Sequence, residues 1–300
     1  MPAPSCVPAQ LLGAPFTLEQ ARRLGVSRKV LRGGRFWTPA PGVRACVDLA
    51  DTLALRCAAM ALLLPSEAAF SHLTAARLCG LPVPGGRTAL GMPVDEPLDV
   101  TCTLRAPRGA GVRGHHADLR GDVRDVGGLR VTSGARTWAD LAALLDLDDL
   151  IVLGDAIAHG GLADLAALGS RAARARRRGS RAMRAAIALL EPRSESPPET
   201  RLRLLLVRAG LPRPAANRDV VVDGAWLARP DLSYPQLRIA IEYDGDHHRT
   251  SRAQWQRDIG RRRVLEDAGW LLLVVTADDV NRRPHEIVDR VRRAIASRSA

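Results

Sequence analysis

Lysine and aromatic residues are scarce in this 300-residue chain. Lys29 is the single lysine, so arginine supplies nearly all of the basic charge behind a formal net charge of +12 at pH 7. Aromatic residues make up 3% of the chain, which argues against the aromatic-rich sheet on which single-stranded RNA binders stack bases. The excess of arginine and alanine is typical of GC-rich coding, so the position of the charge is more informative than its sum.

Cysteine pairs and long apolar runs are also missing. The cysteines are scattered without a CxxC pair, at Cys6, Cys46, Cys57, Cys79 and Cys102. This spacing disfavours a zinc site or a disulfide framework and suits a reducing compartment. No apolar run approaches the length of about 20 residues that spans a bilayer, and the first residues lack the positive flank of a signal peptide. We therefore expect a soluble cytoplasmic protein with no membrane partner and no small-molecule cofactor.

The charge is divided unevenly along the chain. Residues 17–47 and 193–300 are basic, residues 48–170 carry an excess of five acidic residues, and residues 171–184 hold seven arginines and no acidic residue. This pattern favours contact with a polyanion at defined places over a uniformly adhesive surface. Two interpretations of the arginine run stay open. It is either a solvated helical face that links two domains, or a basic surface that contacts successive phosphates of a nucleic acid beside the C-terminal region.

The most informative stretch is residues 229–249, RPDLSYPQLRIAIEYDGDHHR. Its pattern predicts a strand that begins near Asp231, a turn at Pro235, and an apolar strand that ends in Glu242 and Asp244. Period-two geometry puts the last two acids on one face, and pairing of the strands as a hairpin brings Asp231 to the same end. Such carboxylates repel one another unless a cation lies between them, and hard oxygen ligands suit Mg²⁺ or Mn²⁺. The stretch therefore predicts a metal-dependent phosphodiesterase site.

Two histidines and an upstream acid complete this candidate site. Gly245 allows a sharp turn that delivers His247 and His248 beside the acids. A histidine titrates near neutral pH and suits a general base that activates the attacking water, while the other is expected to be a surface residue. Glu199 follows Ser196 at the expected start of a helix, where the helix dipole favours an acid.

Taken in order, these motifs resemble the PD-(D/E)XK nuclease superfamily, and within it the very-short-patch-repair (Vsr)-like endonuclease domains. The resemblance covers residues 193–296. It is carried by SPPETRLRLLLVRAGLP, by Pro230-Asp231, by Glu242-x-Asp244-Gly245 with the two histidines, and by RDIGRRRVLEDAGWLLLVVTADDV. The superfamily's signature lysine would fall at Asp244, and the Vsr-like branch also lacks that lysine and uses histidine nearby.

The resemblance implies a role for each acid. Asp231 and Glu242 would ligate the metal together with a main-chain carbonyl near Tyr243, and Asp244 would be a third ligand or would orient a histidine. Glu199 would be an outer carboxylate that orients metal-bound water, as the alternative to its plain role at a helix start. Three arginines at helical spacing would clamp phosphates or form a solvated helix face, namely Arg257, Arg261 and Arg262.

The N-terminal region is predicted to form two short helices joined by a turn. Thr17 can cap the first helix with Gln20 as its capping-box partner, and Ser27 can cap the second. The spacing is typical of a helix-turn-helix whose second helix enters the major groove, with residues 33–47 as a winged hairpin. An ordinary helical hairpin is the alternative. The basic residues that favour DNA binding are Arg28, Lys29, Arg32 and Arg35.

Residues 52–160 resemble the AbiEi-type antitoxin regulators of type IV toxin–antitoxin systems. The resemblance is carried by AFSHLTAARLCGLPVP, LDVTCTLRAP, GVRGHHADL and GLRVTSGARTWADLAAL. The family's winged helix binds DNA, which implies that role for the basic residues around Arg28. Elsewhere we expect structural roles: His72 as a polar residue at a helix start, and His115 and His116 on a strand edge without a metal.

The sequence thus predicts an α/β chain in four parts. These are a winged helix-turn-helix (1–50), an AbiEi-like α+β domain (51–160), a helical arginine-rich linker (161–192) and a Vsr-like domain of the α/β restriction-endonuclease-like fold (193–300). The predicted function is Mg²⁺-dependent hydrolysis of DNA phosphodiester bonds, targeted by the winged helix. The alternative is an antitoxin-type DNA-binding regulator whose nuclease-fold domain is inactive, and RNA cleavage is a third, weaker hypothesis. No oligomeric state is predicted.

Overall fold

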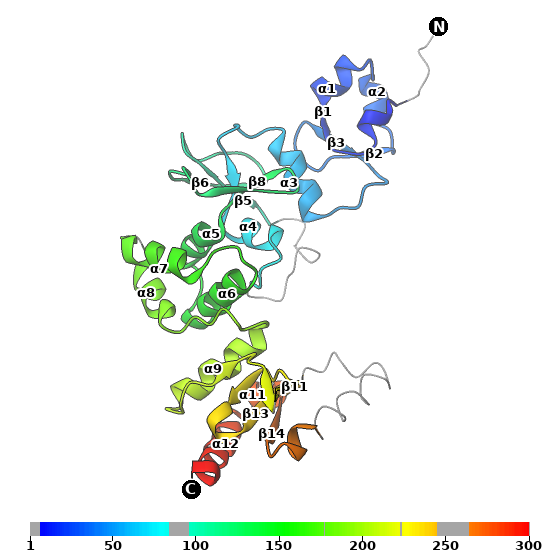
Figure 1. Ribbon diagram of the computed structural model, residues 1–300. Helices are drawn as coiled ribbons and strands as arrows, with labels where there is room; N and C mark the ends of the chain where they lie inside the picture. The colour runs from blue at the N-terminus through cyan, green and yellow to red at the C-terminus, as the bar shows by residue number, and fades with distance from the viewer. Residues whose placement is uncertain (1–6, 84–95, 177, 223, 245–263, 300) are drawn as a thin grey trace. The chain divides into compact units, whose positions relative to one another are not determined.

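The computed structural model describes residues 7–83, 96–176, 178–222, 224–244 and 264–299. The chain divides into two compact units, Met1–Leu144 and Leu145–Ala300. Each unit combines helices with strands, so the chain is of the mixed α/β class (Figure 1). Among the described residues, no helix combines the length and the apolar character needed to cross a lipid bilayer.

The first unit begins with a small module of short helices and strands. Its elements are η1 (Ala9–Leu11), β1 (Phe16–Thr17), α1 (Leu18–Arg23), α2 (Arg28–Leu31), β2 (Phe36–Trp37) and β3 (Val43–Cys46). The strands form an antiparallel sheet in the order β1-β3-β2. The capping predictions are confirmed, because Thr17 and Gln20 form a reciprocal capping box and the Ser27 hydroxyl accepts a hydrogen bond from the Val30 N–H. The edge-to-face contact of the Phe16 and Phe36 rings lies in the core of the module.

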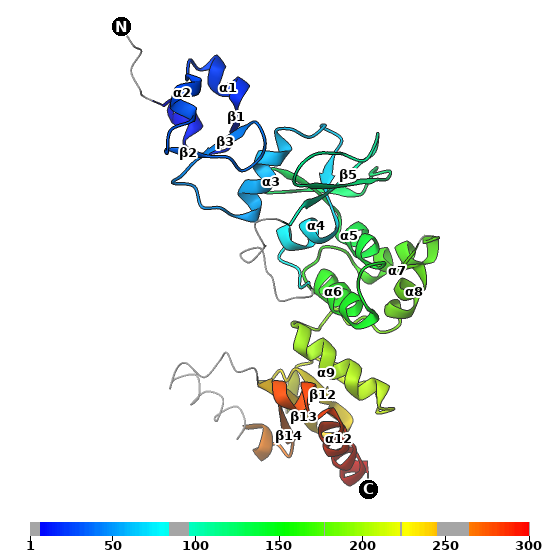
Figure 2. The same ribbon diagram turned by 180° about the vertical axis from the view of Figure 1, so that it is seen from behind.

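The rest of the first unit is a mixed sheet in the order β6-β5-β4-β8-β7. Its elements are α3 (Leu53–Ala61), β4 (Ala69–Phe70), α4 (His72–Leu78), β5 (Leu98–Cys102), β6 (Val112–His116), β7 (Val123–Val126), β8 (Leu129–Thr132) and α5 (Gly134–Leu141). Helix α3 lies on one side of the sheet and α4 and α5 lie on the other (Figures 1 and 2). Leu98, Val100 and Cys102 of β5 enter an apolar core with α3, so the intervening Asp99 and Thr101 face the opposite side.

The second unit begins with helices α6 (Leu147–His159), α7 (Leu165–Arg174), α8 (Ser180–Ile187) and α9 (Pro197–Arg208). Helix α6 is tied to α9 by a buried ion pair, in which Arg203 Nη2 lies 2.7 Å from Asp155 Oδ2. Two further pairs between these helices are more exposed, one from Arg201 to Asp149 at 2.6 Å and one from Arg208 to an acid of the first turn of α6. Much of the basic charge of α9 is therefore neutralised within the protein.

The C-terminal part of this unit is a sheet in the order β14-β13-β12-β9. Its elements are β9 (Ala215–Ala216), β12 (Leu232–Tyr234), η2 (Pro235–Leu237), β13 (Ile239–Asp244), β14 (Leu271–Thr276), α11 (Ala277–Asn281) and α12 (Pro284–Ser299), beside the separate hairpin of β10 (Val220–Val222) and β11 (Ala225–Ala228). Strands β13 and β14 are parallel, and β9, β12 and β13 pair antiparallel. Helices α9 and α12 supply the apolar residues that cover one face of the sheet.

Candidate functional site

The predicted acidic hairpin is confirmed. Strands β12 and β13 pair antiparallel, with Leu232 opposite Ile241, and the chain turns between them through the 3₁₀ helix η2. The same register, continued by one residue, sets Asp231 opposite Glu242. Residues directly opposite each other in an antiparallel pair project from the same side of the sheet, so these two acids share a face.

The side chains of β13 alternate between the two faces of the sheet, and this alternation shows on which face Asp244 lies. Ile241 lies in the core formed with α9 and α12, whereas Ala240 lies in a second apolar cluster on the other face, together with Trp270. Glu242 and Asp244 follow Ala240 at two-residue spacing and therefore lie on its face. All three carboxylates are accordingly directed to the side of the sheet opposite α9 and α12.

A direct contact joins Asp231 to the end of β13. Its Oδ2 accepts a hydrogen bond from the backbone N–H of Tyr243 at 2.7 Å. Asp231, Glu242 and Asp244 are all half-buried. On the far side of β13 the parallel strand β14 ends in register, with Asp244 opposite Thr276. The acids thus gather at the carboxyl ends of two parallel strands, the edge at which open α/β sheets bind ligands.

Glu199 is buried at the start of α9, where three donors hold its carboxylate. The Ser196 hydroxyl donates to Oε1 at 2.6 Å, and the Glu195 N–H and the Asn217 side-chain amide donate to Oε2 at 2.9 and 2.7 Å. Asn217 also donates its backbone N–H to the carbonyl oxygen of Asp231 at 2.9 Å. Two of these donors belong to the start of α9, and the third, Asn217, connects the Glu199 carboxylate to the main chain of Asp231. Both predicted roles of Glu199, at the helix start and as an outer carboxylate of the site, stay predictions.

Five of the residues predicted for this site lie in residues 245–263, outside the described part of the chain: His247, His248, Arg257, Arg261 and Arg262. Their catalytic and phosphate-binding roles stay predictions.

The basic residues predicted to contact DNA are all exposed: Arg28, Lys29, Arg32 and Arg35. The neighbouring Arg22 and Arg23 differ from them, because both form ion pairs with Glu19 at 3.1 Å. Within the described residues, no ion pair involves any of the four predicted contacts. Helix α2 and the turn that follows it thus carry basic side chains for which the described part of the chain provides no ion-pair partner.

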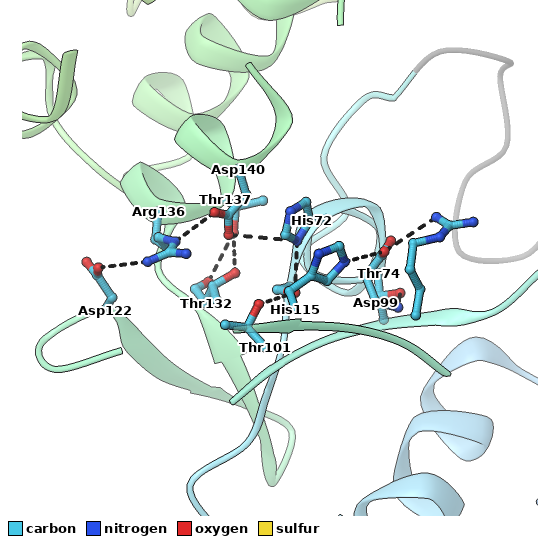
Figure 3. A network of polar contacts seen from close by, with 12 residues as sticks. His72, Thr74, Asp99, Thr101, His115, Asp122, Thr132, Arg136, Thr137 and Asp140 are labelled. Carbon is cyan, nitrogen blue, oxygen red and sulfur yellow. Dashed lines mark hydrogen bonds and ion pairs between the residues drawn. The ribbon is translucent and has the colours of Figure 1, made fainter. Parts of the chain in front are cut away.

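The structure contains a second cluster of polar residues that the sequence did not predict. It lies on the face of the five-stranded sheet below α4 and α5 (Figure 3). One ligand atom each of His72, Asp99 and His115 lies within 4.8 Å of the other two. The imidazole rings of His72 and His115 stack with centroids 3.8 Å apart. Burial lowers the pKa of His72 to about 4, and the positive charge that His115 can carry adds to that shift. His72 does begin a helix and His115 does lie on an edge strand, as expected, but the two converge.

The comparisons with known proteins concern the same C-terminal region as the acidic hairpin. Residues 218–295 match the family model REase_MTES_1575, which describes a restriction-endonuclease-like family. This match supports a nuclease-like domain at the C-terminus of the chain. It includes Asp231, Glu242 and Asp244 and leaves out Glu199 and the N-terminal unit.

Two proteins of Mycobacterium tuberculosis are similar to part of the chain. They are uncharacterized protein MT2308 of strain CDC 1551 / Oshkosh and uncharacterized protein Rv2248 of strain H37Rv, and each is 32% identical over 117 residues. The aligned region is 39% of this chain and 43% of each relative, so the chain spans less than half the length of either. No solved structure matches the chain.

Proposed function

We propose that the chain is a metal-dependent DNA endonuclease of the Vsr-like type, targeted by a winged helix over residues 1–50. The observation that carries the proposal is the convergence of Asp231 and Glu242, which the hairpin register and the Asp231–Tyr243 contact bring to one sheet edge. The restriction-endonuclease-like match over the same residues supports it independently.

The donor set at this edge fits a hard divalent cation. Asp231, Glu242 and Asp244 would hold Mg²⁺ or Mn²⁺ through carboxylate oxygens, which these ions prefer. The bound ion would lower the pKa of the attacking water and stabilise the charge that develops on the phosphate. His247 or His248 would accept the proton of that water, and Arg257, Arg261 and Arg262 would hold phosphate oxygens through their guanidinium groups.

Supercoiled plasmid DNA incubated with the full chain and Mg²⁺ tests this proposal. We expect conversion to open-circular or linear DNA that stops when the metal is chelated. An absence of cleavage on supercoiled, mismatched and single-stranded DNA would instead favour the alternative function, an antitoxin-type DNA-binding regulator. The hydrogen bonds that hold Glu199 at the start of α9 agree with that alternative, and the exposed basic residues of the N-terminal module agree with both functions.

The winged-helix part of the proposal predicts a specific loss of DNA affinity. In the double variant Arg28→Ala with Lys29→Ala, affinity for duplex DNA should fall by roughly tenfold, because two phosphate contacts and their counterion release are lost. The slope of log affinity against log salt concentration should fall in magnitude by about two. Fluorescence anisotropy at several salt concentrations measures both quantities.

The matched control is Arg22→Ala with Arg23→Ala, which removes the same charge from the same module. Both of these arginines are already paired with Glu19, so we expect a much smaller loss. Equal losses in the two double variants would contradict a DNA-reading role for the second helix.

A further inference from the structure

The cluster of His72, Asp99 and His115 contains a buried carboxylate, that of Asp99. Asp99 is in the middle of β5, whose five residues are all buried, and it is 3% exposed. A buried carboxylate is costly unless it is paired or bound to a metal. Arg113, whose side chain is half exposed, places its Nη1 3.4 Å from Asp99 Oδ1, and His115 Nε2 lies closer, at 3.0 Å. The buried carboxylate is thus held by one solvent-exposed guanidinium and by a histidine that is charged only when protonated.

Three separate elements bring the donor atoms together. Asp99 lies on β5, His115 on the neighbouring edge strand β6, and His72 at the first position of α4. His115 Nε2 lies 3.0 Å from Asp99 Oδ1. The His115 side chain is 27% exposed, so the cluster can be reached from solvent along the edge strand.

His72 is held in a strained conformation by contacts that also orient its ring. Its φ of 48° is in the left-handed region, which costs a non-glycine residue about 1–3 kcal/mol and recurs at ligand sites. His72 Nδ1 lies 3.0 Å from the Ser71 hydroxyl, to which Thr101 Oγ1 donates a hydrogen bond at 2.8 Å. These contacts engage Nδ1, which also lies 3.9 Å from Asp140 Oδ2, so Nε2 is the nitrogen that would bind an ion. Outer contacts of this kind orient metal-binding histidines.

The backbone of Asp99 is fixed to the same helix. Its N–H donates to Thr74 Oγ1 at 2.8 Å, and its carbonyl accepts from the Ser71 N–H at 2.9 Å. The position of the carboxylate relative to His72 is therefore set by the first turn of α4, independently of any ion. Figure 3 shows the side chains of His72, Asp99 and His115 close together between the strands and the helix.

We propose that His72, Asp99 and His115 form a binding site for one first-row transition-metal ion of the Zn²⁺ type. Two imidazoles and one carboxylate are donors that Zn²⁺ accepts, whereas Mg²⁺ and Ca²⁺ prefer all-oxygen sets. Three protein ligands leave a coordination position open to water. To bind the ion, the His115 ring turns out of its stack on His72 and ligates through the nitrogen that carries no proton, while its single ring proton stays on the other nitrogen. The contact between His115 and Asp99 is thereby replaced by bonds from both residues to the ion.

Zn²⁺ uptake by the full chain tests the site. The protein is purified without a histidine tag, stripped with chelator, and dialysed against Zn²⁺ in excess Mg²⁺, so that the proposed carboxylate site of the C-terminal domain is filled. Bound zinc is measured by mass spectrometry, and Co²⁺ is used as a spectroscopic substitute. We expect His115→Gln to bind one Zn²⁺ fewer per chain than the parent, or to bind it about a hundredfold more weakly.

The adjacent His116 provides the matched control. It is exposed and its Nε2 contacts the Thr103 carbonyl at 3.0 Å, so His116→Gln should bind Zn²⁺ as the parent does. Equal zinc binding by the parent and by His115→Gln, or equal losses in the His115 and His116 variants, would overturn the proposal.

A measurement on the parent alone covers the case in which His115→Gln fails to fold. Zn²⁺ should protect His72 and His115 from carbethoxylation, mapped by peptide mass spectrometry, and should leave His116 as reactive as before. Unchanged reactivity of His72 and His115 in the presence of Zn²⁺ would show a metal-free polar network and overturn the site.

Discussion

Replacing Asp231 by alanine is expected to lower the rate of Mg²⁺-dependent plasmid cleavage at least about a thousandfold, because loss of a metal ligand removes several kcal/mol of transition-state stabilisation and each 1.36 kcal/mol is about tenfold in rate. Asp231 immediately precedes β12, and its carboxylate accepts a hydrogen bond from the backbone at the end of β13. Its removal therefore takes away the proposed metal ligand on the β12 side and leaves those of β13 in place. The rate is measured from the disappearance of supercoiled DNA on gels.

DNA affinity distinguishes this loss from general misfolding. Removal of a negative charge near the bound phosphate should leave the affinity for duplex DNA unchanged or raise it, as measured by fluorescence anisotropy. Asp267→Asn is the matched control, because Asp267 is an exposed acid of the same domain outside the proposed site, and it should cleave at the parent rate. Parent-level cleavage by Asp231→Ala would remove Asp231 from the mechanism.

The second large effect is on stability. Asp155→Ala should lower the free energy of unfolding of the second unit by about 3–5 kcal/mol, because it leaves the Arg203 guanidinium buried without its counterion. Arg203 is 0% and Asp155 1% exposed, and Asp155 also accepts hydrogen bonds from the Glu191 N–H at 2.6 Å and from the Thr200 hydroxyl at 2.8 Å. Denaturant unfolding followed by circular dichroism measures the change.

Two further variants separate charge burial from simple loss of a contact. Asp149→Ala removes an acid of the same helix that is paired with the half-exposed Arg201, and should cost about 1 kcal/mol or less. Burial raises the pKa of Asp155 while Arg203 opposes that shift. Replacement of a buried ion pair by apolar side chains of similar volume is often close to neutral in stability. Asp155→Leu combined with Arg203→Met should therefore recover most of the stability, and a double variant as unstable as Asp155→Ala would contradict this account.

The acidic hairpin could be predicted from sequence because its signals are local. A proline at the turn and alternating apolar residues determine the pairing, and the pairing alone brings Asp231 opposite Glu242. The start of α9 could be predicted in the same way, because Ser196 and Glu199 are only three residues apart in the sequence. The structure adds the link through Asn217, whose position relative to Asp231 depends on the pairing of β9 with β12, which the sequence did not predict.

The interactions that sequence reasoning missed join distant segments. Asp99 lies in LDVTC, whose alternation of apolar and polar residues is typical of a strand with one solvent-facing side, whereas all five residues are buried. Its approach to His72 and His115 follows from the strand order and from the position of α4. The partners of Arg201 and Arg203 are likewise on α6, about 50 residues upstream, and nothing in the local sequence of α9 identifies these arginines as paired.

Mn²⁺ binding followed by electron paramagnetic resonance tests the central claim, that Asp231 and Glu242 share one divalent ion. The titration is made in the His115→Gln background, so that the proposed histidine site does not contribute. We predict one bound Mn²⁺ per chain, with binding weakened at least about tenfold by Asp231→Asn and equally by Glu242→Gln. Mn²⁺ binding that is absent, or that both substitutions leave unchanged, would contradict the account.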